Sequence, residues 1–274
     1  MQETEERGSS REISLVQRVV AVMGAPLFDN AAIVIVPQGA PKMVQFIYPY
    51  YENPEFFGRQ LQLWSSYDNE LLDRLRVIVV DDGSPGVPAS SAIRSDLPFD
   101  LRLFRIEVDV RWNWLAARNI GMQYAREGWC VLTDMDHMVS AQTLRRIIFG
   151  QHDEQVIYRF SRRENTGEMI HPHPNSMLMT KAMFWRIGGY DEVLSGFYGT
   201  DGDWRRRCAS AAKIRTLSDE LERHERVVDS STTKYLRKQP QDAGKKALIQ
   251  ARVKIKNWRP RTLSFPYHEV DLNA

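Results

Sequence analysis

Three short apolar segments of the chain each run directly into a polar, carboxylate-bearing segment. The polar segments are 49–53 (PYYEN), 81–84 (DDGS) and 133–136 (TDMD). In an open α/β sheet, ligands bind at the carboxyl ends of the strands, where parallel strands would bring these segments together. Carboxylates gathered at such an edge repel one another unless a positive charge lies among them. The sequence therefore predicts a divalent cation at this edge.

Asp134 and Asp136 are the best candidates for binding that cation. They are two residues apart and follow the apolar segment 129–133 directly. On an extended chain, side chains two apart point to the same side, and paired carboxylates suit a hard cation such as Mg²⁺ or Mn²⁺. A solvated turn or a helix cap would also produce a D-x-D pattern, but the position directly after an apolar strand favours the metal site.

Apolar strands and amphipathic helices alternate around these segments. The pattern predicts strands at 43–48, 75–80, 101–108 and 129–133, and helices at 54–67 and 114–126, the second capped by Asn113. Strands alternating with helices indicate an α/β fold with a mixed, mostly parallel sheet flanked by helices on both faces.

Five segments, in this order, resemble the motifs of the family 2 glycosyltransferases, whose fold is the Rossmann-like GT-A fold. They are 46–53 (FIYPYYEN), 79–84 (VVDDGS), 116–121 (AARNIG), 134–136 (DMD) and 188–203 (GGYDEVLSGFYGTDGD). The resemblance covers roughly residues 43–228, and 184–207 also resembles the galactosyltransferase branch of the fold. The family often has Glu-Asp where this chain has Thr200-Asp201, which removes one acidic neighbour.

The resemblance implies a nucleotide-sugar donor, most simply a UDP-sugar. Asp82 would accept a hydrogen bond from the uracil N–H, Pro49 and Tyr50 would flank the base, and Glu52 belongs to the same donor-binding turn. Arg118 would face the base or the diphosphate. The alternatives are a turn aspartate bonded to its own backbone, a half-buried aromatic ring at Tyr50 and a solvated helix charge at Arg118.

The resemblance also implies the metal ligands. Asp136 would bind Mn²⁺ or Mg²⁺, and Asp134 would lie next to the ribose or the metal, which would stabilise the charge on the departing diphosphate. Many members of this fold supply a late histidine as a third ligand, and His224 is the best-placed candidate. The alternative is an exposed histidine without a ligand role. His137 adjoins the D-x-D but would point to the opposite side of a continuing strand.

Asp201 is the candidate general base, which would take the proton from the acceptor hydroxyl as that oxygen attacks the anomeric carbon. A base opposite the leaving group implies inversion. Asp203 is the second candidate, because Gly202 would let the turn present either side chain, and one of the two aspartates could instead cap the helix that begins near Trp204. Gly189 would permit close approach of the backbone to the donor sugar.

The chain divides into an N-terminal extension (1–40), a GT-A domain (41–228) and a basic C-terminal tail (229–274). The net charge of the 274 residues is only +2, so it says little about partners. The basic residues concentrate in 234–261, where ten lysines and arginines face one acid, Asp242. We expect a solvated, partly helical tail, and the alternative is an anchor for nucleic acid or an anionic membrane surface.

Two cysteines, a polar N-terminus and the absence of a long apolar run predict a cytoplasmic protein without a membrane span. The acceptor stays open among a glycan, a lipid, a protein and a modified DNA base. A nucleotidyltransferase would usually carry a Gly-rich basic loop after its first strand, and 51–55 (YENPE) argues against it. A third possibility is a non-catalytic nucleic-acid-binding protein on a degenerate transferase fold, which predicts DNA binding lost with the tail.

Overall fold

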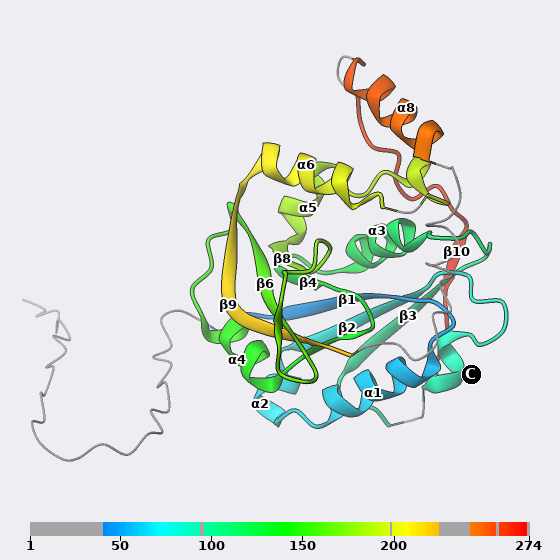
Figure 1. Ribbon diagram of the computed structural model, residues 1–274. Coiled ribbons are helices and arrows are strands. Elements are labelled where there is room, and N and C mark those ends of the chain that lie inside the picture. Colours follow the sequence, from blue (N-terminus) through cyan, green and yellow to red (C-terminus); the bar gives the residue numbers. More distant parts are fainter. Residues whose placement is uncertain (1–40, 94–95, 198, 225–241, 256–257, 273–274) are drawn as a thin grey trace, which may run out of the picture. The chain divides into compact units, whose positions relative to one another are not determined.

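The computed structural model describes residues 41–272, apart from 94–95, 198, 225–241 and 256–257. The predicted extension 1–40 and residues 234–241 and 256–257 of the basic segment therefore lie outside the described residues. The described part contains a ten-stranded mixed sheet with helices on both faces (Figure 1), as predicted. The strand order is β10-β3-β2-β1-β4-β8-β6-β9-β5, with β7 paired to β6.

Four neighbouring parallel strands form the half of the sheet that carries the first three motifs. They are β1 (Val44–Tyr50), β2 (Leu75–Asp81), β3 (Asp100–Ile106) and β4 (Trp129–Leu132). β1 lies between β2 and β4 and is parallel to both, with Ile47 opposite Ile78 on one side and Leu132 on the other. The carboxyl ends of these strands consequently lie at one edge.

The other strands extend the sheet with mixed directions. They are β5 (His137–Val139), β6 (Val156–Glu164), β7 (Met169–Ile170), β8 (Met177–Thr180), β9 (Lys213–Arg223) and β10 (Tyr267–Glu269). β8 is antiparallel to β4, and β10 is antiparallel to β3. Because β10 pairs with β3, the C-terminal segment is not separated from the sheet at residue 228.

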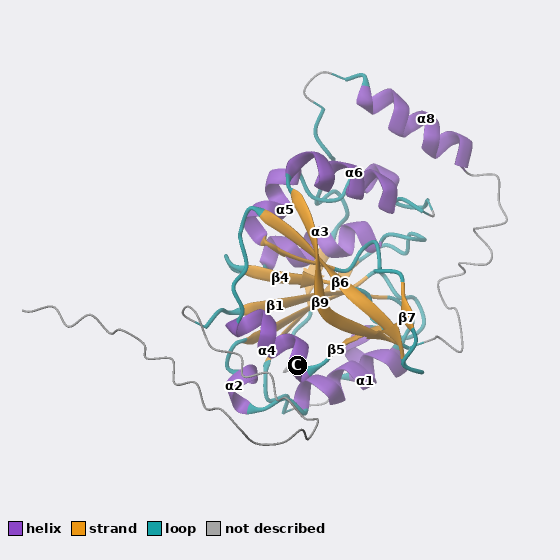
Figure 2. Ribbon diagram, turned by 60° about the vertical axis from the view of Figure 1, so that its left-hand side comes forward, coloured by secondary structure: helices purple, strands orange, loops and turns teal. Residues whose placement is uncertain are grey.

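Helices cover the two faces of the sheet (Figures 1 and 2). The helices of the described residues are α1 (Pro54–Ser65), α2 (Asn69–Leu72), α3 (Trp114–Tyr124), α4 (Ala141–Phe149), α5 (Lys181–Ile187), α6 (Asp201–Ala211) and α8 (Asp242–Val253), with 3-10 turns η1 (Ala89–Ala92) and η2 (Glu192–Leu194). In Figure 1, α1, α2 and α4 lie below the sheet, and α3, α5 and α6 lie above it. None of the helices in the described residues is long and apolar enough to cross a membrane.

The alternation of β1 explains how one strand contributes to two cores. Phe46 and Tyr48 point into the cluster between the sheet and α1, where they pack against Trp64. Ile47 points into the cluster between the sheet and α3. Side chains of successive strand residues point to opposite faces. Phe57, Leu61 and Trp64 are all buried, so the predicted apolar stripe of the first helix is confirmed.

β1 continues two residues beyond its predicted end. Pro49 lies in register with Val80 of β2, and Tyr50 with Asp81. A proline removes a hydrogen-bond donor from a strand. Tyr50 O accepts a hydrogen bond from the β2 side, so the backbone of Pro49 faces the β4 side. The pairing of β1 with β4 has already ended at Leu132, so no β-sheet hydrogen bond is lost at Pro49.

Candidate active site

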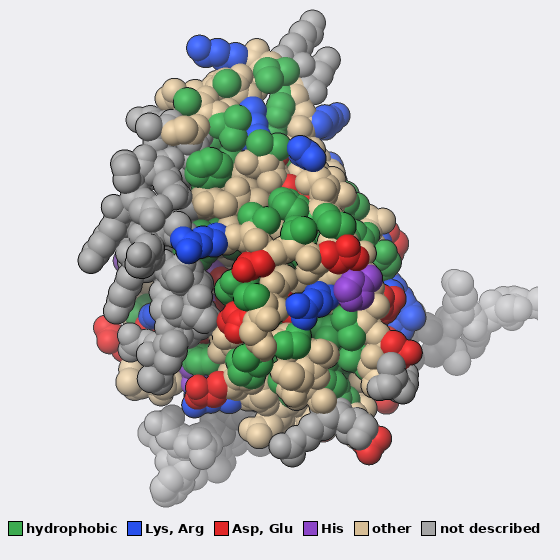
Figure 3. Space-filling model, turned by 90° about the vertical axis from the view of Figure 1, so that its right-hand side faces the viewer, with side chains coloured by type: hydrophobic (Ala, Val, Ile, Leu, Met, Phe, Trp, Pro, Cys, Tyr) green, Lys and Arg blue, Asp and Glu red, His purple; other side chains and the backbone are tan. Residues whose placement is uncertain are grey.

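The polar segments that follow β1, β2 and β4 meet at one edge of the sheet, as predicted. The Asp82 amide donates to Tyr50 O at 2.8 Å, and the Thr133 amide donates to Ile47 O at 3.4 Å. These bonds tie the chain beyond β2 and the chain beyond β4 to the central strand. On the face shown in Figure 3, acidic and basic side chains are intermixed rather than gathered into a patch of one sign.

The turn after β2 is held by Asp81, which fixes the position of Asp82. Asp81 accepts hydrogen bonds from the amides of Ser84 and Ala89, both at 2.8 Å. Gly83 has φ 75°, and a Cβ there would lie 2.4 Å from Val108 O, so the turn needs a glycine at this position. The first aspartate of the pair is therefore structural, and the second is left to face the edge.

Asp82 is almost fully buried, and its Oδ1 has no hydrogen-bond partner among the described residues. Burial, reinforced by the negative charges of Asp81 and Asp109, raises the pKa of Asp82 well above its usual value. Buried polar atoms in folded proteins usually have a partner. An N–H group supplied by a ligand would satisfy this oxygen, which is the role predicted for Asp82.

The turn after β1 makes structural contacts. Tyr50 is fully buried, its hydroxyl donates to Val87 O at 2.7 Å and its ring packs on Phe57. Glu52 accepts hydrogen bonds from the amides of Gly86 and Val87 at 2.6 and 3.0 Å. These contacts favour a core role for Tyr50 and a loop-holding role for Glu52. Pro49 is half-buried, and its contact with a base stays a prediction.

The D-x-D segment is a turn, so the expectation of an extended chain was wrong. The His137 amide donates to Asp134 O at 3.0 Å, which closes the turn and sends the two carboxylates to different partners. Asp134 Oδ1 accepts from Arg118 at 2.5 Å, and Asp136 Oδ1 lies 2.7 Å from His137 Nδ1. His137 is buried in β5 and contacts Asp136 rather than pointing away from it.

Arg118 is fully buried on α3, which excludes a solvated helix charge. Besides Asp134, its guanidinium donates to Asn175 O at 2.8 Å and to the Tyr190 hydroxyl at 3.0 Å. The guanidinium also lies over the ring of Trp114, 4.9 Å from the ring centroid. A buried charge is stabilised only when it is paired and hydrogen-bonded, and these contacts supply both conditions. Arg118 therefore holds the first aspartate of the D-x-D in place.

Asn175 is a site residue that the sequence analysis missed. Its side-chain amide donates a hydrogen bond to Asp201 Oδ1, and its backbone oxygen accepts from Arg118. Asn175 therefore connects the predicted base to the arginine that holds Asp134. The only indication of this role in the sequence was that Asn175 is a polar residue just before an apolar segment, which forms the fully buried strand β8.

Asp201 and Asp203 have different environments. Asp203 is buried, with its carboxylate paired to Arg206 at 2.7 Å and to Arg207 at 2.9 Å. Asp201, at the first position of α6, is half-buried and contacts Asn175. The N-cap residue of α6 is Thr200, so neither aspartate holds the capping position. The ion pairs of Asp203 favour Asp201 as the base.

The third predicted metal ligand lies beside the D-x-D. The His224 amide donates to Asp136 O at 2.9 Å, whereas the His224 ring contacts Glu222 at 2.7 Å. Within the described part of the chain, no three His, Cys, Asp or Glu side chains are arranged to hold a metal. Mg²⁺-type ions are commonly held by one or two carboxylates together with substrate phosphates and water. Asp134 and Asp136 fit that mode, and the ligand role of His224 stays a prediction.

A second histidine packs against this turn. The ring of His173 stacks on the ring of His137 with centroids 4.6 Å apart, and its Nε2 lies 3.4 Å from Asp134 Oδ2. Burial lowers the pKa of His173 to about 3, despite the opposing effect of the Asp134 charge. His173 is thus a neutral ring near neutral pH, which can donate or accept a hydrogen bond but adds no charge beside the carboxylates.

The segment GGYDE at 188–192 packs against α3 and against residues 262–264. A Cβ on Gly189, which has φ 67°, would lie 2.9 Å from Asn119 Oδ1 and 3.2 Å from Thr262. Glu192 is buried and accepts hydrogen bonds from Asn119 and from the amides of Leu263 and Ser264. The close approach at Gly189 is to the protein, and its contact with a donor sugar stays a prediction.

Comparison with known proteins identifies the family and the fold of the chain. The model of the family described as glycosyl transferase family 2 matches residues 49–204. The crystal structure of S. aureus TarS 1–349 is 17% identical, with a TM-score of 0.55 over 66% of this chain and 60% of that chain. The same TarS fragment in complex with UDP-GlcNAc is 16% identical, with a TM-score of 0.62 over 79% of this chain and 68% of that chain.

A third similar structure is the mannosyltransferase PcManGT from Pyrobaculum calidifontis, in complex with GDP-Man and Mn²⁺. It is 16% identical, with a TM-score of 0.54 over 74% of this chain and 62% of that chain. No curated protein matches the chain. Likeness at such identities shows the fold, and the chain spans about 60% of the first of these structures. Because the family model covers more than half of the sequence, the chain belongs to glycosyl transferase family 2.

Proposed function

We propose that this chain is an inverting, metal-dependent glycosyltransferase that moves a sugar from a UDP-sugar to an acceptor hydroxyl. The observation that carries the proposal is the chain of contacts from Asp134 through Arg118 and Asn175 to Asp201. It links a carboxylate of the D-x-D to a half-exposed carboxylate suited to proton transfer. The donor complexes of TarS with UDP-GlcNAc and of PcManGT with GDP-Man and Mn²⁺ support a nucleotide-sugar.

The donor would lie along the carboxyl edge of β1, β2 and β4. Asp82 Oδ1, which is buried and unpartnered within the described residues, would accept the uracil N–H. Asp134 and Asp136 would hold Mn²⁺ or Mg²⁺, and the bound ion would act as a Lewis acid toward the diphosphate. Arg118 would keep Asp134 oriented, because its guanidinium is fixed by three acceptors.

Asp201 would act on the acceptor. Its carboxylate would take the proton of the acceptor hydroxyl as that oxygen forms a bond to the anomeric carbon. The bond from the anomeric carbon to the diphosphate would break, and its electron pair would leave with UDP. Attack from the side opposite the leaving group inverts the anomeric configuration. Asn175 would orient Asp201 through its side-chain amide.

The test is a panel of nucleotide-sugars with Mn²⁺, in which slow hydrolysis of the donor is measured as release of the nucleoside diphosphate. We expect UDP release from at least one UDP-sugar, and its loss with EDTA and with Asp136→Ala. An exposed aspartate, Asp73→Ala, is the matched control and should leave the rate unchanged. UDP release that persists in excess EDTA would contradict the metal dependence, and release from GDP-sugars alone would contradict the choice of donor.

A further inference from the structure

The ring of His137 lies between an arginine and the second aspartate of the D-x-D. Its Nδ1 lies 2.7 Å from Asp136 Oδ1, and its Nε2 lies 3.1 Å from Arg162 Nη1. Arg162 is in β6, 25 residues further along the chain, and its own Nε donates to His171 O at 2.9 Å. The imidazole ring therefore connects a guanidinium on one side to a carboxylate on the other.

These two contacts decide which ring nitrogen of His137 carries the proton. A guanidinium has N–H donors and no acceptor, so the hydrogen bond with Arg162 requires Nε2 of His137 to be the acceptor. A neutral imidazole whose Nε2 accepts carries its hydrogen on Nδ1. Nδ1–H therefore donates to Asp136 Oδ1, and Arg162 sets the direction of this hydrogen bond.

The His137 ring is also held at its backbone and in its plane. The backbone oxygen of His137 accepts hydrogen bonds from Gln60 Nε2 at 2.8 Å and from the Tyr48 hydroxyl at 3.2 Å. Both of these side chains are fully buried. The ring of His173 stacks on the His137 ring, with centroids 4.6 Å apart and planes 29° from parallel. The position, the plane and the tautomer of the ring are thus each fixed by a separate contact.

Asp136 stays accessible although His137 holds it. The side chain of Asp136 is 23% exposed, whereas that of His137 is 2% exposed. The other aspartate of the D-x-D, Asp134, is held by a different donor, Arg118. Residues that hydrogen-bond a metal ligand from outside the coordination sphere fix its orientation, and their loss typically costs about 10–100-fold in metal affinity. His137 is placed to act on Asp136 in this way.

We propose that His137, with its tautomer set by Arg162, is a positioning residue that orients the Asp136 carboxylate toward the divalent cation. The proposal rests on the proposed function for the role of Asp136 as a metal ligand. The hydrogen bond from Nδ1–H restricts rotation of the carboxylate about its bond to Cβ, so the group is arranged before the ion arrives. The residue that adjoins the D-x-D thus acts through Asp136 and is not itself a ligand.

Two variants of the full chain separate the hydrogen bond from the packing of the ring. His137→Asn places an amide N–H donor at the position of Nδ1 but has no ring to stack on His173, whereas His137→Phe keeps a ring but has no donor. Binding of Mn²⁺ alone is measured from the electron paramagnetic resonance signal of the free ion. We expect the affinity to fall at least about tenfold in His137→Phe and less than about threefold in His137→Asn. Thermal unfolding of the same variants records the loss of packing separately.

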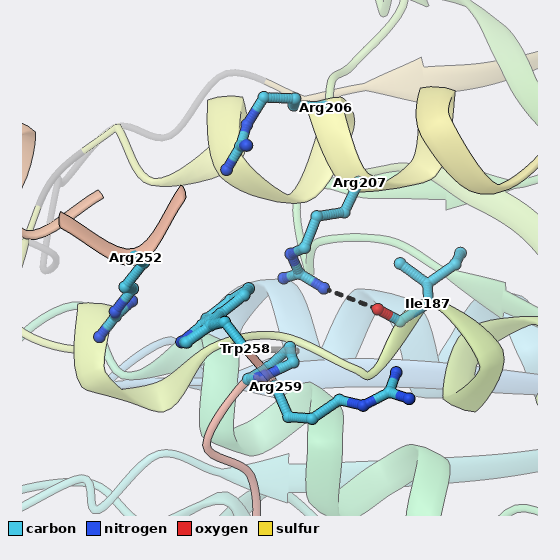
Figure 4. A pocket seen from close by; sticks show the side chains of 7 residues that line it. Ile187, Arg206, Arg207, Arg252, Trp258 and Arg259 are labelled. Atoms are coloured by element: carbon cyan, nitrogen blue, oxygen red, sulfur yellow. Dashed lines mark hydrogen bonds between the residues drawn. The ribbon is translucent and has the colours of Figure 1, made fainter. Parts of the chain in front are cut away.

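The tautomer gives a second measurement, which does not depend on the metal. The ¹⁵N resonances of the His137 ring should show the proton on Nδ1 in the native chain and a shift toward the Nε2 tautomer in Arg162→Leu. The matched control is Arg259→Leu, which removes the same charge from an exposed residue. Arg259 lines a cavity formed by α5, α6 and the C-terminal segment (Figure 4), and the control should leave the His137 resonances unchanged.

A proton on Nε2 of native His137 would overturn the proposal, and so would the absence of Mn²⁺ binding by the native chain. Equal weakening of Mn²⁺ binding in His137→Asn and His137→Phe would also overturn it, because the ring would then act by packing. Donor hydrolysis on the same preparations separates this proposal from the proposed function. If Mn²⁺ binds with the expected pattern but no donor is hydrolysed, the proposed function fails. If a donor is hydrolysed but Mn²⁺ binds equally to all variants, the positioning role fails.

Discussion

The guanidinium of Arg118 and the carboxylate of Asp134 form an ion pair in which the arginine has no exposed surface. The pair joins α3 to the turn after β4, and its two residues lie 16 positions apart in the chain. Arg118 also binds Asn175 and Tyr190, so a single side chain connects three parts of the site. The predictions below follow from this connection and from the contacts around it.

Arg118→Lys should abolish donor hydrolysis and lower the melting temperature. A lysine ammonium is a point charge on a flexible stem and cannot keep the arrangement of Asp134, Asn175 and Tyr190 that the planar guanidinium holds. Breaking a buried pair typically costs roughly 3 kcal/mol. Arg126→Lys, at an exposed position after α3, is the control. Native stability and activity in Arg118→Lys would show that charge alone is enough.

Asp201→Asn should retain UDP binding but lose transfer, because the amide cannot take the acceptor proton. Asp203→Asn should mainly destabilise the fold, by roughly 3 kcal/mol, because it leaves Arg206 and Arg207 without their shared carboxylate. Transfer rate and thermal unfolding, measured on both variants, separate the two roles. Transfer retained by Asp201→Asn would move the general base elsewhere, first to Asp203.

Asp82→Asn should weaken UDP binding while making the fold more stable near neutral pH. The pKa of Asp82 is raised in the folded chain, so above the unfolded value of 3.8 the folded state keeps a proton that the unfolded state has lost. Its carboxyl therefore makes the native fold less stable as pH rises from that value toward the raised pKa, by about 1.4 kcal/mol for each pH unit between the two.

The corresponding measurement is the melting-temperature difference between Asp82→Asn and the native chain at about pH 4 and about pH 8. The difference should be small at the acid end and positive at the alkaline end. Asp81→Asn should instead lower the melting temperature, because Asp81 accepts two backbone hydrogen bonds that an amide would satisfy less well. A stabilisation by Asp82→Asn that did not vary with pH would argue against a raised pKa.

Glu192→Ala should release the C-terminal segment from the sheet. The Glu192 carboxylate is buried and accepts from Asn119, Leu263 and Ser264, so its removal leaves these donors unsatisfied at roughly 1–3 kcal/mol each. Hydrogen exchange should accelerate in 259–272 and at the β3 edge that β10 covers. Glu154→Ala, an exposed acid, serves as control. Unchanged exchange in 259–272 would mean that β10 pairing alone retains the segment.

The sequence by itself determined the order of elements and the edge at which they would act. Apolar strands that end in polar turns, such as 75–80 before Asp81 and Asp82, are local patterns of period two and of turn chemistry. The resemblance to the family 2 motifs added the expectation of a nucleotide-sugar donor. The fully buried stripe of Phe57, Leu61 and Trp64 was likewise readable from helical spacing.

Only the tertiary structure decided which carboxylates are held by the protein and which face the edge. Asp201 and Asp203 are equivalent in sequence, and the difference between them comes from Asn175 and Arg207, which long-range packing places beside them. The turn at Asp134 and the docking of the C-terminal segment on Glu192 have the same origin. Partners distant in the chain leave no periodic pattern, because their pairing is set by the packing of whole elements rather than by neighbouring residues.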